Sequence, residues 1–201
     1  FILGNGSNIL IADAGFRGLA IQLRITNYEL RITKLTVDAG ASISTLAKKT
    51  AERGLAGLEF GIGIPGAIGG AICGNAGAFG QNIGQVVTEV KIFKTPPFPP
   101  ITKGGLGGVK ICQLNNLSCQ FGYRDSIFKK HKNWIILSAK FQLKKDFADH
   151  CQKRLKEFLQ NKIASQPIGE KSAGSIFKNY EITDQQELKN IAAKLKIENC
   201  K

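Results

Sequence analysis

The sequence contains no methionine, and no segment of it approaches about 18 uninterrupted apolar residues, the length that a membrane-spanning helix needs. Its first residues also lack the charged segment and apolar core of a signal peptide. We therefore expect no membrane segment and a cytoplasmic location. Because a strand-like apolar run begins at Phe1 while methionine is absent, we also expect the sequence to be a fragment of a longer chain.

Cysteine pairs of the C-x-x-C kind are absent as well. The five cysteines are an odd number, which argues against a closed disulfide framework and favours a reducing cytoplasm. His131 and His150 have no ligand spacing, so we predict no metal site.

Two common nucleotide-binding motifs are missing. No G-x-G-x-x-G opens a helix with an acidic residue about 20 positions on, and there is no P-loop lysine. The 28 Lys and Arg exceed the 15 Asp and Glu, which gives a formal charge of +13 and favours an anionic partner: a nucleotide, a nucleic acid or an acidic surface. The lysines are scattered, however, and no RNA-binding aromatic pattern accompanies them, so we interpret most of them as solvated surface.

The most informative stretch that is present is 57–84, where glycine and alanine replace most larger side chains. Ten of its residues are glycine, and isoleucines of the buried type stand between them. Glycine bares its N–H groups and admits backbone angles closed to other residues, so such a run can form a concave surface for phosphate oxygens. Composition alone equally allows a pair of tight turns between short buried strands.

A second glycine turn, from Gly4 to Asn8, lies near the start of the chain. It separates the apolar runs 1–3 and 9–11, a pattern that predicts strand, turn and strand. Together the two loops would suit a pyrophosphate held by backbone N–H groups and small side chains.

Hydrophobic periodicity predicts alternating strands and helices. Residues Ile43, Leu46, Ala47 and Ala51 recur at helical spacing up to Gly54, a plausible stop. An apolar stripe from Phe147 to Leu159 predicts a helix that ends before Pro167 and opens a second domain. Strands are predicted at 19–23, 35–39, 90–93 and 134–143.

Two segments look inserted. Residues 95–108 contain four prolines in six residues and then a glycine cluster, which predicts a solvent-facing loop. Residues 24–33 repeat the triplet Arg-Ile-Thr at an interval of seven and are predicted to extend a surface hairpin.

Four motifs, in this order and spacing, resemble the UDP-N-acetylenolpyruvoylglucosamine reductase family, also called UDP-N-acetylmuramate dehydrogenases. They are LGNGSNILI at 3–11, GIPGAIGGAICGNAGAFG at 63–80, FGYRDSIFK at 121–129 and SAGSIFKN at 172–179. The resemblance covers almost the whole chain apart from the two inserts and the tail.

The resemblance implies an α+β protein. Residues 1–145 would form an FAD-binding domain of the vanillyl-alcohol-oxidase type, without its N-terminal part, and residues 146–201 would begin a truncated α+β substrate domain. The family's late glutamate, a third catalytic group, would lie beyond residue 201. The tail 180–201 departs from the family pattern, and Tyr180 stands where the family has proline.

The resemblance also implies the activity. The family uses NADPH and FAD to reduce the enolpyruvyl group of UDP-N-acetylglucosamine enolpyruvate, a UDP-sugar, to UDP-N-acetylmuramate for peptidoglycan synthesis. No nucleic acid, membrane or obligate protein partner is implied. The residues that the resemblance assigns to FAD are Gly4, Asn5, Gly6, Ser7, Asn8, Pro65, Gly66, Ala67, Gly69, Gly70, Asn75, Ala76, Gly77, Ala78 and Gly80.

For catalysis the resemblance assigns Arg124 to the substrate carboxylate and Ser175 to proton donation. Hydride addition builds negative charge toward that carboxylate, and a guanidinium can hold its oxygens in bidentate fashion. Tyr123 and Asn179 are implied to contact substrate. By themselves these residues also fit plain structural roles: an ion pair of Arg124 with Asp125, a core tyrosine, a Gly-Ser turn and a capping asparagine.

Two other functions stay open from the sequence. A different FAD-dependent oxidoreductase of the same fold would share the two glycine loops but has no reason to carry both YRDSIFK and SAGSIFKN. A basic nucleic-acid-binding module would use the positive charge, but it should show clustered Lys and Arg and a recognised fold motif.

Overall fold

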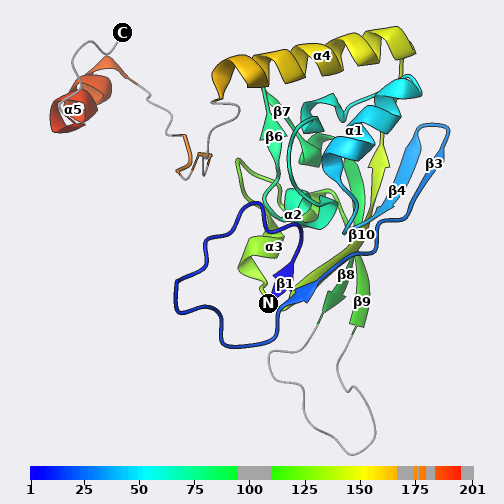
Figure 1. Ribbon diagram of the computed structural model, residues 1–201, viewed down its shortest axis with the longest axis horizontal. Helices are drawn as coiled ribbons and strands as arrows, with labels where there is room; N and C mark the ends of the chain where they lie inside the picture. Colours follow the sequence, from blue (N-terminus) through cyan, green and yellow to red (C-terminus); the bar gives the residue numbers. More distant parts are fainter. Residues whose placement is uncertain (95–109, 167–173, 176, 180–183, 196–201) are drawn as a thin grey trace, which may run out of the picture. The chain divides into compact units, whose positions relative to one another are not determined.

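The protein was examined as a computed structural model, which describes residues 1–94, 110–166, 174–175, 177–179 and 184–195 (Figure 1). The chain forms two compact units, Phe1–Ile168 and Gly169–Lys201, which are described separately below. The predicted loop at 95–108 lies outside the described residues.

A five-stranded antiparallel sheet is the centre of the first unit, with the strand order β3-β4-β10-β8-β9 (Figure 1). Ala139 in the central strand stands opposite Val37 on one side and Val90 on the other, and all three side chains are buried. This alternation of buried and exposed residues confirms three of the predicted strands. The strands are β3 (Tyr28–Arg31), β4 (Lys34–Asp38), β8 (Val87–Lys94), β9 (Lys110–Asn115) and β10 (Trp134–Gln142).

The Arg-Ile-Thr segment forms part of this sheet. Its second half is β3, which pairs with β4 through a turn at Ile32, where φ is +54° and the side chain is 88% exposed. The predicted surface hairpin at 24–33 is thus present as the β3–β4 hairpin at the sheet edge.

The helix α1 (Ile43–Glu52) begins and ends as the sequence predicts. Its N-cap Ser42 accepts a hydrogen bond from the Thr45 N–H at 3.3 Å, and the chain leaves the helix at Gly54 with φ of +64°. The buried face of α1 joins one apolar core with the inward side chains of the sheet and with the short helix α2 (Ile68–Cys73).

The helix α4 (Ala148–Ser165) follows the short strand β11 (Lys144–Lys145), which pairs with β5 (Leu55–Ala56). It packs against α1 and against the short 3-10 turn η1 (Glu59–Gly61) of the first unit (Figure 1). The helix itself is confirmed. The compact units divide after Ile168, and Cys151 of α4 is buried in the first unit. The predicted domain boundary 145/146 stays a prediction.

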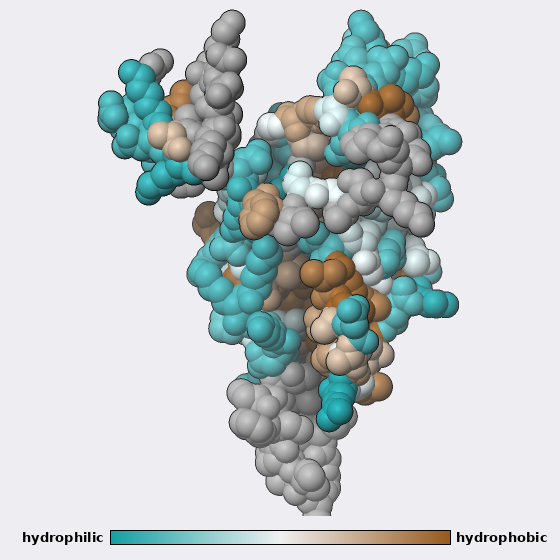
Figure 2. Space-filling model, turned by 60° about the vertical axis from the view of Figure 1, so that its left-hand side comes forward, coloured by the Kyte–Doolittle hydropathy of each residue, from teal (hydrophilic) through white to brown (hydrophobic). Residues whose placement is uncertain are grey.

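The N-terminal segment differs most from the sequence pattern. The strand β1 (Ile2–Leu3) pairs in parallel with β2 (Ile21–Gln22), so only two residues of the predicted strand 19–23 are in a ladder. The strand predicted at 9–11 is wrong: this run has no pairing partner among the described residues, and Leu10 is 99% exposed. Figure 2 shows hydrophobic surface exposed in patches on one face of the molecule.

The second unit is described over residues 174–175, 177–179 and 184–195. Its helix α5 (Gln185–Leu195) begins at Asp184, whose carboxylate accepts a hydrogen bond from the Glu187 N–H at 2.6 Å. Within the described residues of the chain, no helix is long and apolar enough to cross a membrane.

Candidate functional site

The two glycine loops lie side by side, although about sixty residues separate them in sequence. A methyl group added at Gly4 would be 3.4 Å from the Ala67 Cβ, and one added at Gly66 would be 3.8 Å from the Ser7 Oγ. The Gly69 N–H donates to the Ala39 carbonyl at 2.8 Å, which fixes the second loop against the end of β4. The structure therefore brings together the residues that the sequence assigned to one cofactor.

Backbone donors are unused at this meeting point. In the described part of the chain, no N–H group from Gly4 to Asn8 donates to a protein acceptor, and the same holds for Gly70 in the first turn of α2. A Cβ added at Gly6 or at Gly70 would meet no atom within 4 Å. Free backbone N–H groups bind anionic oxygens well, so the loops are suited to a phosphate-bearing cofactor.

Other glycines of 57–84 are required by the packing of the protein itself. A Cβ at Gly77 would lie 2.2 Å from the Gln81 carbonyl oxygen, inside the hairpin of β6 (Gly77–Ala78) and β7 (Gln81–Asn82). A Cβ at Gly84 would lie 2.7 Å from the Phe121 ring. The packing interpretation therefore holds for Gly77 and Gly84, and the cofactor contacts of the other glycines stay predictions.

Asn75 joins the second glycine loop to the segment that carries Arg124. Its buried side chain donates from Nδ2 to the Gly122 carbonyl at 2.7 Å and accepts at Oδ1 from the Gly84 N–H at 3.0 Å. The backbone of Ala76 is likewise engaged, with Ala71 and Ile83. The Asn75 amide thus holds protein groups, and its FAD contact stays a prediction.

Arg124 lies on a tight turn in which Gly122 and Asp125 exchange N–H and carbonyl hydrogen bonds at 3.0 and 3.2 Å. Its φ is +53°, in the left-handed region. The Lys129 Nζ donates to the Arg124 carbonyl at 2.5 Å. Ser126, which is buried, donates from Oγ to the Cys73 carbonyl at 2.7 Å, so the turn is fixed to the end of α2.

The guanidinium of Arg124 is exposed, and within the described residues it makes no ion pair, including none with Asp125. Its Cζ lies 6.0 Å from the centroid of the Tyr123 ring, which is itself 57% exposed. Phe128, in contrast, is a core residue. Arg124 and Tyr123 are therefore available to a ligand, and their substrate contacts stay predictions.

Ser175 and Asn179 belong to the second unit and are both exposed. Ser175 follows Gly174, whose φ is +72°. Phe177, between the two polar residues, is 88% exposed. The roles of Ser175 and Asn179 stay predictions.

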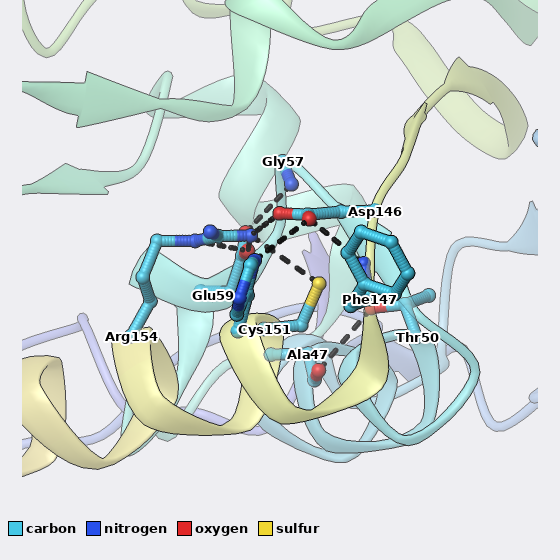
Figure 3. A network of polar contacts seen from close by, with 9 residues as sticks. Ala47, Thr50, Gly57, Glu59, Asp146, Phe147, Cys151 and Arg154 are labelled. Carbon is cyan, nitrogen blue, oxygen red and sulfur yellow. Dashed lines mark hydrogen bonds and ion pairs between the residues drawn. The ribbon is translucent and has the colours of Figure 1, made fainter.

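A buried polar network that sequence reasoning missed connects α4 to the beginning of the second glycine loop (Figure 3). Glu59 is 3% exposed, and its Oε1 accepts hydrogen bonds from Nε and Nη2 of Arg154 at 3.0 and 2.9 Å. Arg154 also donates to Asp146 at 2.6 Å, and the Gly57 N–H donates to the other Glu59 oxygen at 2.6 Å. Glu59 is the one charged residue in 57–84, and that was the available signal.

Arg154 and Asp146 favour the charged form of each other. The hydrogen bond from Arg154 is the largest cause that lowers the pKa of Asp146, and the Phe147 N–H, which donates to the same carboxylate, adds to it. Further along α4, Lys162 donates from Nζ to the Gly63 carbonyl at 2.7 Å, and burial lowers the pKa of Lys162. The start of the second loop is thus held by α4 through charged side chains.

Comparisons with known proteins agree with this arrangement. A family model described as an FAD binding domain matches residues 1–95, which contain both glycine loops. The UDP-N-acetylenolpyruvoylglucosamine reductase of Solibacter usitatus is 36% identical over 183 residues, covering 91% of this chain and 54% of its own length. That of Clostridioides difficile is 37% identical over 179 residues, covering 88% and 55%.

A solved structure is similar as well. The crystal structure of UDP-N-acetylenolpyruvylglucosamine reductase from Thermus caldophilus has a TM-score of 0.71 and 29% sequence identity, covering 90% of this chain and 61% of that chain. The predicted α+β fold of the FAD-binding type is confirmed by this likeness and by the family match. The chain spans about half the length of the curated relatives that it matches.

Proposed function

Because the chain belongs to the UDP-N-acetylenolpyruvoylglucosamine reductase family, we propose that the protein binds FAD at its two glycine loops and uses NADPH to reduce a UDP-sugar. The substrate is UDP-N-acetylglucosamine enolpyruvate, and the product is the peptidoglycan precursor UDP-N-acetylmuramate. Bound FAD would supply the carrier that takes a hydride from NADPH and passes it to C3 of the enolpyruvyl group.

The observation that supports this proposal most is the row of free N–H groups from Gly4 to Asn8, next to Gly66 and Ala67 of the second glycine loop. These donors, with the Ser7 and Asn8 side chains, would hold the pyrophosphate of FAD. The formal charge of +13 also favours three anionic ligands: FAD, NADPH and a UDP-sugar.

The substrate would be held by groups that the protein leaves unpaired. Arg124 presents a guanidinium with no ion-pair partner in the described residues, and it would bind the carboxylate next to the enol ether. Negative charge grows on that carboxylate as C3 is reduced, so the contact strengthens toward the transition state. Ser175 would then give the proton that C2 needs, and Tyr123 and Asn179 would contact the rest of the substrate.

Spectroscopy on the purified protein tests the proposal. After reconstitution with FAD and removal of the excess, we expect the visible absorbance bands of bound flavin. NADPH should bleach these bands, and UDP-N-acetylglucosamine enolpyruvate should restore them without oxygen. Absence of flavin bands after reconstitution would contradict FAD binding, whereas bleaching without restoration would favour an oxidoreductase with another substrate.

The substitution Gly70→Leu should weaken FAD binding without lowering the stability of the fold. Gly70 is exposed, a Cβ there meets nothing within 4 Å, and leucine favours a helix over glycine by about 1 kcal/mol, so the thermal midpoint should not fall. If FAD occupies this space, its dissociation constant should rise at least about tenfold, which corresponds to about 1.4 kcal/mol. FAD titration followed by flavin fluorescence measures the change.

The matched control is Gln152→Leu, which adds the same side chain to an exposed position of α4. Its affinity for FAD should equal that of the unaltered protein. Equal affinities in the Gly70 and Gln152 variants would show that FAD lies elsewhere.

A further inference from the structure

The turn that carries Arg124 is held by side chains from three places. Asn75 and Ser126 fix its two ends to the second glycine loop and to α2, as described above. Between those ends stands the carbonyl of Arg124, and its hydrogen-bond donor is the ammonium group of Lys129. Lys129 looks like an ordinary surface lysine in the sequence, so this contact gives it a role that the pattern does not.

We propose that Lys129 is a positioning residue: its ammonium holds the Arg124 backbone in the left-handed conformation and so sets the direction from which the guanidinium meets a carboxylate. The identity of the carboxylate, that of the enolpyruvyl group, rests on the proposed function. The role of Lys129 in the conformation of Arg124 does not.

The backbone geometry explains why a holder is needed. Arg124 has φ of +53°, and a residue with a Cβ seldom adopts this region without support. The carbonyl of Arg124 accepts a hydrogen bond from a charged donor, Lys129 Nζ, at 2.5 Å. Without that donor the carbonyl would be free to turn, and the left-handed conformation that sets the direction of the side chain would lose its support.

The backbone of Lys129 is held in place by the core of the first unit. It lies on the short helix α3 (Ile127–Lys130), whose Phe128 is 5% exposed and anchored in the core. The residue that begins this helix, Ser126, is buried and hydrogen-bonded to Cys73. The base of the Lys129 side chain is therefore attached to the same core that holds the glycine loop.

Orientation matters for the chemistry because bidentate binding of a carboxylate requires the plane of the guanidinium to match that of the ligand. A disordered arginine would still attract the anion through its charge. It would lose the paired hydrogen bonds, and these strengthen as the substrate is reduced. Loss of Lys129 should therefore weaken substrate binding and slow the substrate half-reaction without changing the cofactor loops.

The test compares Lys129→Met with Lys130→Met in the FAD-loaded protein. Both variants remove one positive charge at adjacent positions of α3, but among the described residues only Lys129 bonds to the Arg124 carbonyl. The first readout needs no substrate: the Cα and carbonyl chemical shifts of Arg124, which report φ. They should lose their left-handed values in Lys129→Met and keep them in Lys130→Met and in Lys129→Arg.

The second readout is the dissociation constant of UDP-N-acetylglucosamine enolpyruvate by calorimetry. We expect a rise of about tenfold in Lys129→Met, less than about twofold in Lys130→Met, and recovery in Lys129→Arg. The rate of flavin reduction by NADPH should be equal in all of them. Unchanged Arg124 shifts in Lys129→Met, or equal dissociation constants in the two methionine variants, would overturn the inference.

Failure of the proposed function would look different. The unaltered protein would then not bind the enolpyruvyl substrate, while the Arg124 shifts would still respond to Lys129→Met. A drop in thermal midpoint that fully accounts for the weaker binding would show a merely structural role for Lys129 and would also overturn the inference.

Discussion

Replacing Arg154 by alanine should lower the free energy of unfolding of the first unit by about 3 kcal/mol. The substitution leaves the Glu59 carboxylate, 3% exposed, without its charged partner, and a buried charge that loses its partner typically costs 3–5 kcal/mol. The lower end applies because the Arg154 side chain is 36% exposed, so water already screens part of the pair. Urea unfolding followed by circular dichroism measures the change.

A second arginine–glutamate pair in the same unit provides the control. Arg31 and Glu29 are bonded at 2.6 Å on the edge strand β3, with side chains 78% and 59% exposed. Exposed pairs of this kind contribute about 0–1 kcal/mol, so Arg31→Ala should have a small effect. Similar losses in the Arg154 and Arg31 variants would mean that the buried network does not stabilise the unit.

Acid should weaken the network in a defined direction. Arg154 lowers the pKa of Asp146 below its ordinary value near 3.9, so the unfolded chain takes up this proton first. The stability that Asp146 contributes is therefore present above about pH 4 and is lost as the pH falls through its lower, folded pKa. The difference between the unaltered protein and Arg154→Ala should shrink over the same range.

The elements that the sequence predicted best are those whose stability comes from one buried face. Strand β10 and helix α1 contain enough alternating or helically spaced apolar residues to identify them without knowledge of their neighbours. The run 9–11 is just as apolar, yet it forms no strand, because a strand also needs a ladder partner and the described residues offer none. Periodicity reports which residues prefer burial and says nothing of the partner.

The site follows the same rule. The two glycine loops could be proposed as one site from the sequence because close approach of a ligand requires many small residues in a row; the ligand contact itself stays a prediction. The hydrogen bonds that hold the site could not be predicted. Asn75 bonds to the carbonyl of Gly122, which is distant in sequence, and Lys129 bonds to the carbonyl of Arg124, a contact that hydrophobic periodicity does not report. The Glu59–Arg154 pair was missed as well, although Glu59 offered a signal: it is a lone charge among apolar residues, and its burial demands a cation.

The sequence also did not show which glycines are required by packing and which leave room for a ligand. A side chain at Gly77 or Gly84 would collide with the protein, while one at Gly70 would meet open space. Only the three-dimensional structure distinguishes these cases, because all three residues lie in one continuous glycine-rich segment. The open position is where a ligand has room, and it is the position at which a substitution tests the cofactor without testing the fold.

Replacing Ser175 by alanine should give the largest kinetic effect among the substitutions considered. If Ser175 donates the proton as proposed, reoxidation of the reduced flavin by UDP-N-acetylglucosamine enolpyruvate should slow by about 100- to 10,000-fold, the usual contribution of a general acid. Flavin reduction by NADPH should be almost unchanged, because the proton is needed only at C2 of the substrate. Stopped-flow absorbance measures the two half-reactions separately.

The position of Ser175 makes this substitution a clean one. The residue is exposed, and the left-handed backbone before it belongs to Gly174, where φ is +72°. Loss of one exposed hydroxyl should therefore leave the fold unaltered. Ser165→Ala, which removes a hydroxyl bonded to the Asn161 carbonyl at the end of α4, is the matched control and should affect neither half-reaction. If both half-reactions of Ser175→Ala kept their rates, another group would have to deliver the proton, and the exposed hydroxyl would return to the simpler role of a turn residue.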